Sequence, residues 1–234
     1  MIVIENLSVR FGSVKPIDGL TATLAAPIAG LIGPNGAGKT TLLNVLSGFV
    51  VPASGRVVLD GDDLLAKKPL ARVKTGLRRA FQTEQVVEDL NVYENITALA
   101  DHVCAPTHKH DSVAEAIEFA GLGALAATQG RALNLFQRRL VEIAKSVIGK
   151  PRLILLDEPA AGLTEEEGAV IRDLVLRIPA AFGAQTIVID HDVELIRALC
   201  SETLVLDYGR KLALGPTAAV LAQDDVRRAY LGEL

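Results

Sequence analysis

Residues 33–40 of this 234-residue chain read Gly-Pro-Asn-Gly-Ala-Gly-Lys-Thr, a composition and spacing that could bind phosphate. The glycines allow a tight loop whose backbone N–H groups point at phosphate oxygens, and a helix that begins there would add its positive N-terminus. We expect Lys39 to neutralise the β- and γ-phosphates, Thr40 to bind Mg²⁺ and Thr41 to contact the α-phosphate. The nucleotide-binding residues predicted in this phosphate loop are Gly33, Pro34, Asn35, Gly36, Ala37, Gly38, Lys39, Thr40 and Thr41.

A second chemical signal lies at the end of an apolar run. Residues 153–156 read Leu-Ile-Leu-Leu and are followed directly by Asp157 and Glu158. Such a run predicts a buried strand, and ligands of open α/β sheets bind at the carboxyl ends of the strands. We expect Asp157 to hold Mg²⁺ through water and Glu158 to polarise the attacking water, because adjacent carboxylates there point to different sides. With the phosphate loop, these carboxylates indicate a nucleoside triphosphatase rather than a solvated acidic strand end.

Alternating strand and helix patterns along the chain must position these residues, and they predict an α/β fold. We expect strands at residues 2–4, 20–24, 29–32, 56–60, 77–81, 153–156, 186–189 and 204–206. We expect helices at residues 39–47, 92–103, 112–120, 136–148, 165–178 and 193–200. The helical middle of the chain is therefore predicted to be an insertion between two halves of an α/β core.

Composition and charge exclude several classes of protein. The net charge of −4 and the aromatic fraction of 4% argue against nucleic-acid binding. The longest uncharged run, residues 19–38, contains two prolines and five glycines, so it is not predicted to be a membrane-spanning helix. Cys104 and Cys200 have no C-x-x-C spacing and are expected to be reduced thiols of a cytosolic protein. The isolated basic pairs at residues 67–68 and 78–79 are expected to be solvated.

Three stretches, in this order, resemble the ATP-binding subunits of ABC transporters. They are G-P-N-G-A-G-K-T-T at residues 33–41, L-L-D-E-P-A-A-G-L at residues 155–163 and I-V-I-D-H-D-V-E at residues 187–194. The resemblance covers nearly the whole chain. It implies an ATP hydrolase coupled to transport, with ATP and Mg²⁺ as cofactors.

The resemblance also implies roles for residues outside the two signals. Phe11 matches the aromatic residue that stacks on adenine, although a half-buried phenylalanine of a sheet is the alternative. Gln82, in R-A-F-Q, matches the glutamine that binds the metal and links the attacking water to the transporter contact. His191 matches the switch histidine, which contacts the γ-phosphate and positions Glu158. Residues 161–164, Ala-Gly-Leu-Thr, match a loop that crosses the interface between two such subunits.

The fold implied is α/β: a P-loop NTPase core, which is a RecA-like mixed sheet with flanking helices, plus a small antiparallel β subdomain and an inserted α-helical subdomain. We expect residues 1–234 to form a single cassette. Residues 1–83 and 150–234 would form the β subdomain and ATPase core, and residues 84–149 the helical subdomain with the signature region.

The partners implied are a second ABC ATPase subunit, in a homodimer or heterodimer, and integral membrane permease subunits. The permease is expected to dock in a groove near Gln82 and residues 83–89, and no nucleic-acid partner is expected. This places the chain in the cytoplasm, peripheral on the cytoplasmic face of the inner (plasma) membrane.

One motif departs from the family pattern. The signature L-S-G-G-Q aligns with residues 133–137, Leu-Asn-Leu-Phe-Gln, so that Asn134 and Gln137 would contact ATP bound on the opposite subunit. Phe136 stands where the family has a second glycine, at a close approach of backbone and phosphate. Either its ring turns into the helical subdomain and leaves activity intact, or the subunit supplies a weakened half-site and needs a different partner. The second alternative is favoured because such importers commonly pair two different ATPases.

Within the family, the chain resembles the subunits of branched-chain amino-acid importers. The matching stretches are R-A-F-Q-T with L-N-V-Y-E-N, D-E-P-A-A-G-L, and the ending V-L-D-Y-G-R-K with A-Y-L-G-E. Subunits that serve urea or short-chain amide import look nearly the same. The predicted function is therefore MgATP hydrolysis at a subunit interface, driving uptake of branched-chain or related amino acids.

Three other functions agree less well with the sequence. A weakly hydrolysing, regulatory nucleotide-binding subunit is favoured by Phe136 but opposed by Asp157, Glu158 and His191. ABC ATPases of DNA repair or translation carry tandem cassettes, coiled-coil insertions or basic surfaces, and none is evident in this sequence. A small-molecule kinase would have no use for His191 or the Ala-Gly-Leu-Thr stretch.

Overall fold

The computed structural model describes residues 1–231 of the chain. Residues 232–234, which include part of the A-Y-L-G-E stretch, lie outside the described residues. The chain forms two compact units. The first unit contains Met1–Arg72 and the chain from Ile187 onward, and the second contains Val73–Thr186.

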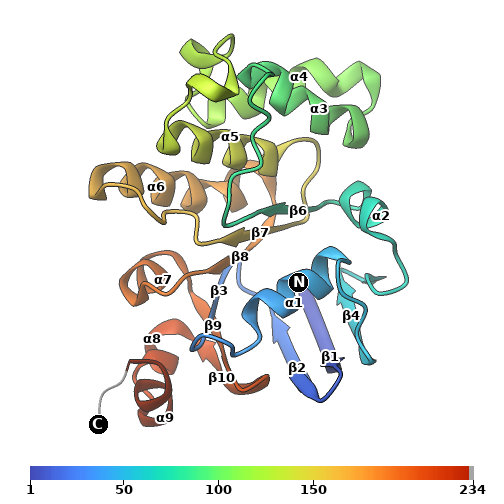
Figure 1. Ribbon diagram of the computed structural model, residues 1–234, viewed down its shortest axis with the longest axis vertical. Coiled ribbons are helices and arrows are strands. Elements are labelled where there is room, and N and C mark those ends of the chain that lie inside the picture. Colours follow the sequence, from blue (N-terminus) through green and yellow to red (C-terminus); the bar gives the residue numbers. More distant parts are fainter. Residues whose placement is uncertain (232–234) are drawn as a thin grey trace. The chain divides into compact units, whose positions relative to one another are not determined.

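A four-stranded antiparallel sheet belongs to the first unit (Figure 1). Its strands follow the order β2-β1-β4-β5. Along the first half of β1, buried side chains such as Ile2 and Ile4 alternate with more exposed ones, as expected for a sheet with one covered face. The strands are β1 (Ile2–Phe11), β2 (Val14–Leu24), β4 (Ser54–Leu59) and β5 (Asp62–Asp63).

A second group of strands in the same unit leads into the phosphate loop. Strand β3 (Ile28–Ile32) is buried along its whole length and runs parallel to β9 (Glu202–Asp207), which pairs antiparallel with β10 (Arg210–Pro216). Helix α1 (Lys39–Ser47) follows the loop, and Gly48 in the left-handed conformation ends it. The remaining helices here are α7 (Val193–Leu199), α8 (Thr217–Leu221), α9 (Asp224–Val226) and a π-helical turn (Arg227–Leu231).

The second unit combines a parallel strand pair with a group of helices. Strands β6 (Leu77–Ala80) and β7 (Leu153–Asp157) are parallel, with Arg79 opposite Leu155. Helices α3 (Val92–Val103), α4 (Pro106–Phe119) and α5 (Leu135–Val147) pack against one another, and α5 also packs on α6 (Glu165–Phe182) and β6 (Figure 1). Two 3₁₀ turns, Gly123–Leu125 and Gly130–Ala132, lie before α5. Helix α2 (Pro69–Lys74) and strand β8 (Gln185–Ile189) carry the chain from one unit to the other.

The predicted α/β class is confirmed, and most of the predicted elements are present. The predicted helices at residues 39–47 and 92–103 have the observed bounds. Helix α4 begins six residues before the predicted start at Ser112, because Pro106 occupies its first turn. The elements not predicted are β5, α2, β10, α8 and α9. Within residues 1–231, no helix is both long and apolar enough to span a bilayer.

Candidate functional site

The phosphate loop follows β3 and has a backbone that requires glycine at two positions. Gly33 has φ 150°, and a Cβ there would overlap the backbone oxygen of Leu206. Gly38 has φ 104°, and a Cβ there would overlap the backbone oxygen of Pro16. Any larger residue would push the loop away from β9 or β2, so these glycines fix the position of the loop in the first unit.

Lys39 and the start of α1 give this loop its positive character. The Nζ atom of Lys39 donates to the backbone oxygens of Gly33 and Pro34, at 2.6 and 3.0 Å, which holds the ammonium group over the loop. No side chain caps the N-terminus of α1, and no acidic residue occupies its first turn. The first N–H groups of α1 and the Lys39 charge together form the arrangement that binds anions at a helix N-terminus.

A backbone contact that the sequence did not predict supports the loop. Gly209, in the turn between β9 and β10, donates its N–H to the Ala37 oxygen at 3.0 Å and accepts from the Asp18 N–H at 2.9 Å. Gly209 has φ 77°, and a Cβ there would stand 2.7 Å from the Pro16 oxygen. The sequence signal was the Tyr-Gly turn at residues 208–209, where glycine allows the close approach.

The other two predicted residues of the first unit lie at the surface. Phe11 ends β1 and is 54% exposed, so its ring is accessible for stacking. His191 follows β8, and its side chain is 75% exposed, with Nδ1 3.6 Å from Oδ1 of the buried Asp190. Asp190 also accepts from the Asp192 N–H, and Asp192 caps α7 by accepting from the N–H groups of Glu194 and Leu195. Two aspartates thus shape the turn that presents the imidazole.

In the second unit, the two carboxylates at the end of β7 have different partners. Asp157 is buried and forms an ion pair with Arg79, while Glu158 accepts a 2.9 Å hydrogen bond from Nε2 of Gln82. Glu158 has φ 51°, a left-handed conformation that is uncommon for a residue with a side chain and often found at functional sites. The structure therefore brings Gln82, Asp157 and Glu158 together at the ends of β6 and β7.

The prediction that the basic pair at residues 78–79 is solvated is wrong. Arg78 is 4% exposed and the Arg79 side chain 6% exposed, because both lie on the buried strand β6. Burial lowers the pKa of Arg78 to about 10, opposed by its interaction with Cys104. Burial also lowers the pKa of Arg79, and the Asp157 carboxylate opposes that shift. Both arginines thus carry their charge inside the second unit at neutral pH.

The predicted metal ligands supply the donor set that Mg²⁺ prefers. Thr40, Gln82 and Asp157 offer hydroxyl, amide and carboxylate oxygens, and Mg²⁺ takes oxygen ligands. The described part of the chain contains no cluster of three or more His, Cys, Asp or Glu side chains suited to a metal ion. Mg²⁺ commonly keeps several waters and is bound through one or two carboxylates together with the phosphates of its nucleotide.

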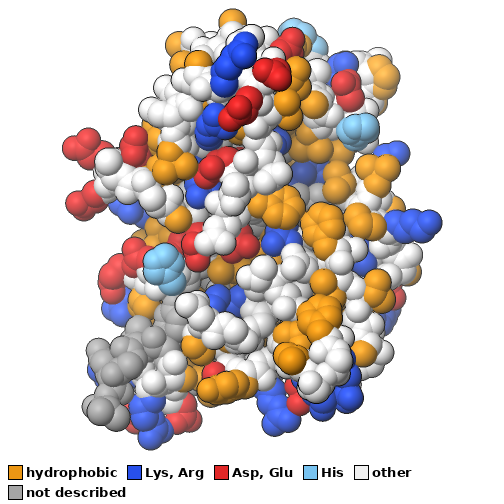
Figure 2. All heavy atoms as spheres, in the orientation of Figure 1, with side chains coloured by type: hydrophobic (Ala, Val, Ile, Leu, Met, Phe, Trp, Pro, Cys, Tyr) orange, Lys and Arg blue, Asp and Glu red, His pale blue; other side chains and the backbone are white. Residues whose placement is uncertain are grey.

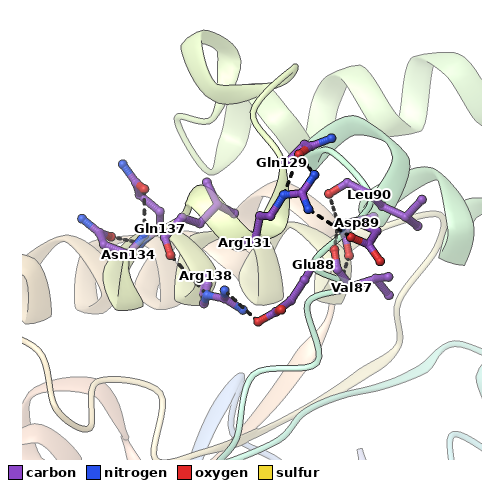
Figure 3. A network of polar contacts seen from close by, with 11 residues as sticks. Val87, Glu88, Asp89, Leu90, Gln129, Arg131, Asn134, Gln137 and Arg138 are labelled. Atoms are coloured by element: carbon purple, nitrogen blue, oxygen red, sulfur yellow. Dashed lines mark hydrogen bonds and ion pairs between the residues drawn. The ribbon is translucent and has the colours of Figure 1, made fainter.

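The signature segment opens helix α5 with a reciprocal cap. The Asn134 side chain accepts from the Gln137 N–H at 2.8 Å, and Gln137 Oε1 accepts from the Asn134 N–H at 3.0 Å (Figure 3). Among the described residues, no group accepts from the N–H groups of Leu135 and Phe136. Asn134 and Gln137 are therefore engaged with each other, and the two N–H groups between them remain available.

The two residues that replace the signature glycines differ in their surroundings. Leu135 is 39% exposed and lies beside Gly162, where a Cβ would stand 3.1 Å from its Cδ2. Phe136 is half-buried. Helix α5 thus begins with two apolar residues, and the first of them lies beside the Ala-Gly-Leu-Thr stretch that precedes α6.

The helix after that stretch begins with acidic residues. Acidic side chains gather over α6 in Figure 2, and its first turn contains Glu165, Glu166 and Glu167.

Helix α5 also holds the segment that follows Gln82. Buried Arg139 donates to the backbone oxygens of Phe81 and Gln82, and its Nε lies 3.0 Å from Glu84 Oε1. Further along, Arg138 pairs with Glu88 at 3.4 Å (Figure 3). The sequence did not predict Arg139, because an arginine in the middle of a helical pattern normally faces water.

Comparison with known proteins places these features in a family. The ABC transporter family model matches residues 21–161. The chain is 30% identical to the high-affinity branched-chain amino acid transport ATP-binding protein BraF of Pseudomonas aeruginosa, over 98% of this chain and 97% of that one. It is 31% identical to the lipopolysaccharide export system ATP-binding protein LptB of Haemophilus influenzae, over 98% and 96%.

A solved structure agrees along the whole chain. It is the ADP conformation of MJ1267, an ATP-binding cassette of an ABC transporter, with a TM-score of 0.87, 28% identity, and coverage of 100% of this chain and 99% of that one. The expected fold, a P-loop NTPase fold of mixed α/β type, is confirmed by this likeness. The chain belongs to the ABC transporter family and is an ATP-hydrolysing cassette of that family.

Proposed function

We propose that this chain is the MgATP-hydrolysing subunit of a membrane importer for branched-chain or related amino acids. The proposal rests on the similarity to BraF over nearly the full length of both chains. The subunit would work as a single cassette, peripheral on the cytoplasmic face of the membrane, with a second ABC ATPase and permease subunits docked near Gln82. The ATPase subunit would not touch the cargo. The identity of the cargo therefore rests on resemblance alone.

The observation that carries the proposed chemistry is the hydrogen bond between Gln82 and Glu158. It joins the predicted water-polarising carboxylate to a segment, residues 83–89, that we propose as the permease contact. Glu158 would orient and polarise the attacking water, and His191 would contact the γ-phosphate. Phe11 would stack on adenine, and Lys39 and the N–H groups of the phosphate loop would hold the phosphates.

Mg²⁺, when bound, would neutralise charge on the β- and γ-phosphates. Thr40, Gln82 and Asp157 would hold it, with Asp157 acting through water. After hydrolysis the γ-phosphate no longer joins the two subunits, so they part. This differential contact would drive the conformational change of the importer.

The Glu158→Gln variant tests the catalytic assignment. We expect ATP hydrolysis by the chain assembled with its partner subunits to fall at least about 100-fold, because the amide cannot polarise water, while ATP binding persists. Phosphate release measures the rate, and retention of radiolabelled ATP measures binding. A variant that hydrolyses ATP at the normal rate would show that another group acts on the water.

The cargo is tested in cells that lack this chain. We expect loss of radiolabelled leucine uptake and its restoration by the wild-type gene but not by the Glu158→Gln gene. Similarity to LptB favours lipopolysaccharide export as a second candidate. Normal leucine uptake with lipopolysaccharide retained at the inner membrane would favour export, and loss of urea or amide uptake alone would favour that cargo.

A further inference from the structure

We propose that Arg79 is a positioning residue that holds the carboxylate of Asp157 in place for Mg²⁺. This inference rests on the proposed role of Asp157 as a metal-binding residue. It concerns a side chain to which the family resemblance described above assigned no role.

The strand register places Arg79 and Asp157 on the same face of the sheet. Arg79 on β6 lies opposite Leu155 on β7, and Asp157 follows Leu155 by two residues. Because side chains alternate along a strand, Leu155 and Asp157 point the same way. Nη2 of Arg79 lies 3.5 Å from Oδ2 of Asp157. The pairing therefore follows from the strand pairing itself.

The guanidinium group of Arg79 is held on a second side. It lies over the ring of Phe81, with Cζ 4.5 Å from the ring centroid, an arrangement favoured for arginine and aromatic faces. The side chains of Arg79 and Asp157 are 6% and 10% exposed, so water screens their attraction little. A fixed guanidinium against a buried carboxylate defines the direction in which the carboxylate points.

Arg78 is an internal comparison for Arg79. It is the neighbouring residue on β6 and is also buried, but it donates to the backbone oxygens of Val73, Leu77 and Ile148. A buried arginine on this strand can thus donate its N–H groups to backbone oxygens that lie away from the carboxylates at the strand end. Arg79 instead forms an ion pair with the predicted metal-binding residue, Asp157.

The expected consequence is a dependence of Mg²⁺ affinity on Arg79. Groups that orient a metal-binding side chain typically change metal affinity by about 10- to 100-fold when they are replaced. Without Arg79, Asp157 loses this ion pair and can turn away from the metal position. Binding of metal-free ATP depends on the phosphate loop and should not change.

The experiment is a Mg²⁺ titration of a fluorescent ATP analogue bound to Glu158→Gln protein, in which hydrolysis is blocked. We expect Arg79→Met to raise the Mg²⁺ concentration at half-saturation at least about tenfold, with unchanged analogue binding in EDTA. Arg79→Lys should restore part of the affinity, because it keeps the charge but not the planar fork. Arg78→Met is the matched control and should leave the Mg²⁺ midpoint unchanged.

A double-mutant cycle decides whether the effect passes through Asp157. In an Asp157→Asn background, Arg79→Met should shift the midpoint no further. Equal midpoints for the Arg79→Met and Arg78→Met proteins would overturn the inference, as would a full additional shift in the Asp157→Asn background. If Arg79→Met does not fold, Arg79→Gln is measured with the same outcomes. If the Glu158→Gln protein without further substitutions does not bind the ATP analogue in EDTA, the proposed function itself is contradicted.

Discussion

At the scale of single residues, burial decides the chemistry of the two free thiols. Cys200 is 4% exposed, and burial, followed by the charge of Asp190, raises its pKa from 9.0 to about 12. Cys104 is only partly buried. The thiolate is the reactive form, so the native protein should contain one inert thiol and one that is accessible to reagents.

We predict that a Cys104→Ser protein, which retains Cys200, reacts with a thiol reagent about 1,000-fold more slowly when native than in guanidinium at pH 8, because its thiolate fraction is that much smaller. A Cys200→Ser protein should react readily when native. Since the folded pKa of Cys200 is the higher one, its contribution to stability is complete below pH 9 and is lost as pH rises through about 12. Equal native rates for the two variants would contradict this assignment.

At the scale of elements, helix α5 stabilises the segment after Gln82 through two unequal ion pairs. The side chains of Arg139 and Glu84 are 7% and 14% exposed, whereas those of Arg138 and Glu88 are 21% and 67% exposed. Loss of one partner from a buried pair leaves the other charge without compensation. An exposed pair is screened by water and contributes little. The adjacent arginines therefore provide a matched comparison.

We predict that Arg139→Met lowers the free energy of unfolding by about 3 kcal/mol, and that Arg138→Met lowers it by less than about 1 kcal/mol. Urea denaturation measures both values, and hydrogen exchange of residues 83–88 should show faster opening only in the first variant. Adding Glu84→Met to Arg139→Met should recover part of the loss, because no charge is then left buried. Equal losses for the two single variants would mean that the segment is held by other contacts.

The elements that sequence patterns predicted best are those with local end signals. Helix α1 ends at Gly48, which adopts the left-handed conformation, and α3 begins at Asn91, which caps it together with Glu94. Strand β10 was not predicted because it contains Gly and Pro, which are unfavourable in strands. It forms a strand because it pairs with β9, and its own sequence does not indicate this pairing.

The candidate site divides in the same way. The spacing of its glycines predicted the phosphate loop, and the apolar run predicted the strand that delivers Asp157 and Glu158. The burial of Arg79 and its pairing with Asp157 depend on the register of β6 against β7, which the sequence of neither strand specifies. The partner of a side chain across a sheet depends on how distant segments pair in the folded structure. The basic pair at residues 78–79, on a short strand, was therefore predicted to be solvated.

At the scale of the whole molecule, the described residues contain one phosphate loop and one signature segment. The family resemblance implies that ATP is held between the phosphate loop of one subunit and the signature of another. Phe136 then determines which second ATPase subunit can close around ATP with this chain. Phe136 is half-buried on the first turn of α5, where the N–H groups of Leu135 and Phe136 remain available. A benzyl group at this approach should oppose closure of two identical subunits around ATP.

We predict that Glu158→Gln protein with MgATP remains monomeric by light scattering, and that adding Phe136→Gly to this variant doubles its mass. Glycine at the first turn costs about 0.5–1 kcal/mol of stability, so Leu135→Gly in the same background is the matched control and should stay monomeric. In wild-type protein, Phe136→Gly should raise the ATPase rate for the same reason.

Dimerisation of Glu158→Gln protein with Phe136 present would mean that the ring is accommodated and that two copies of this chain complete both sites. A monomer that dimerises only without Phe136 would mean that the working partner is a second ATPase with a different signature.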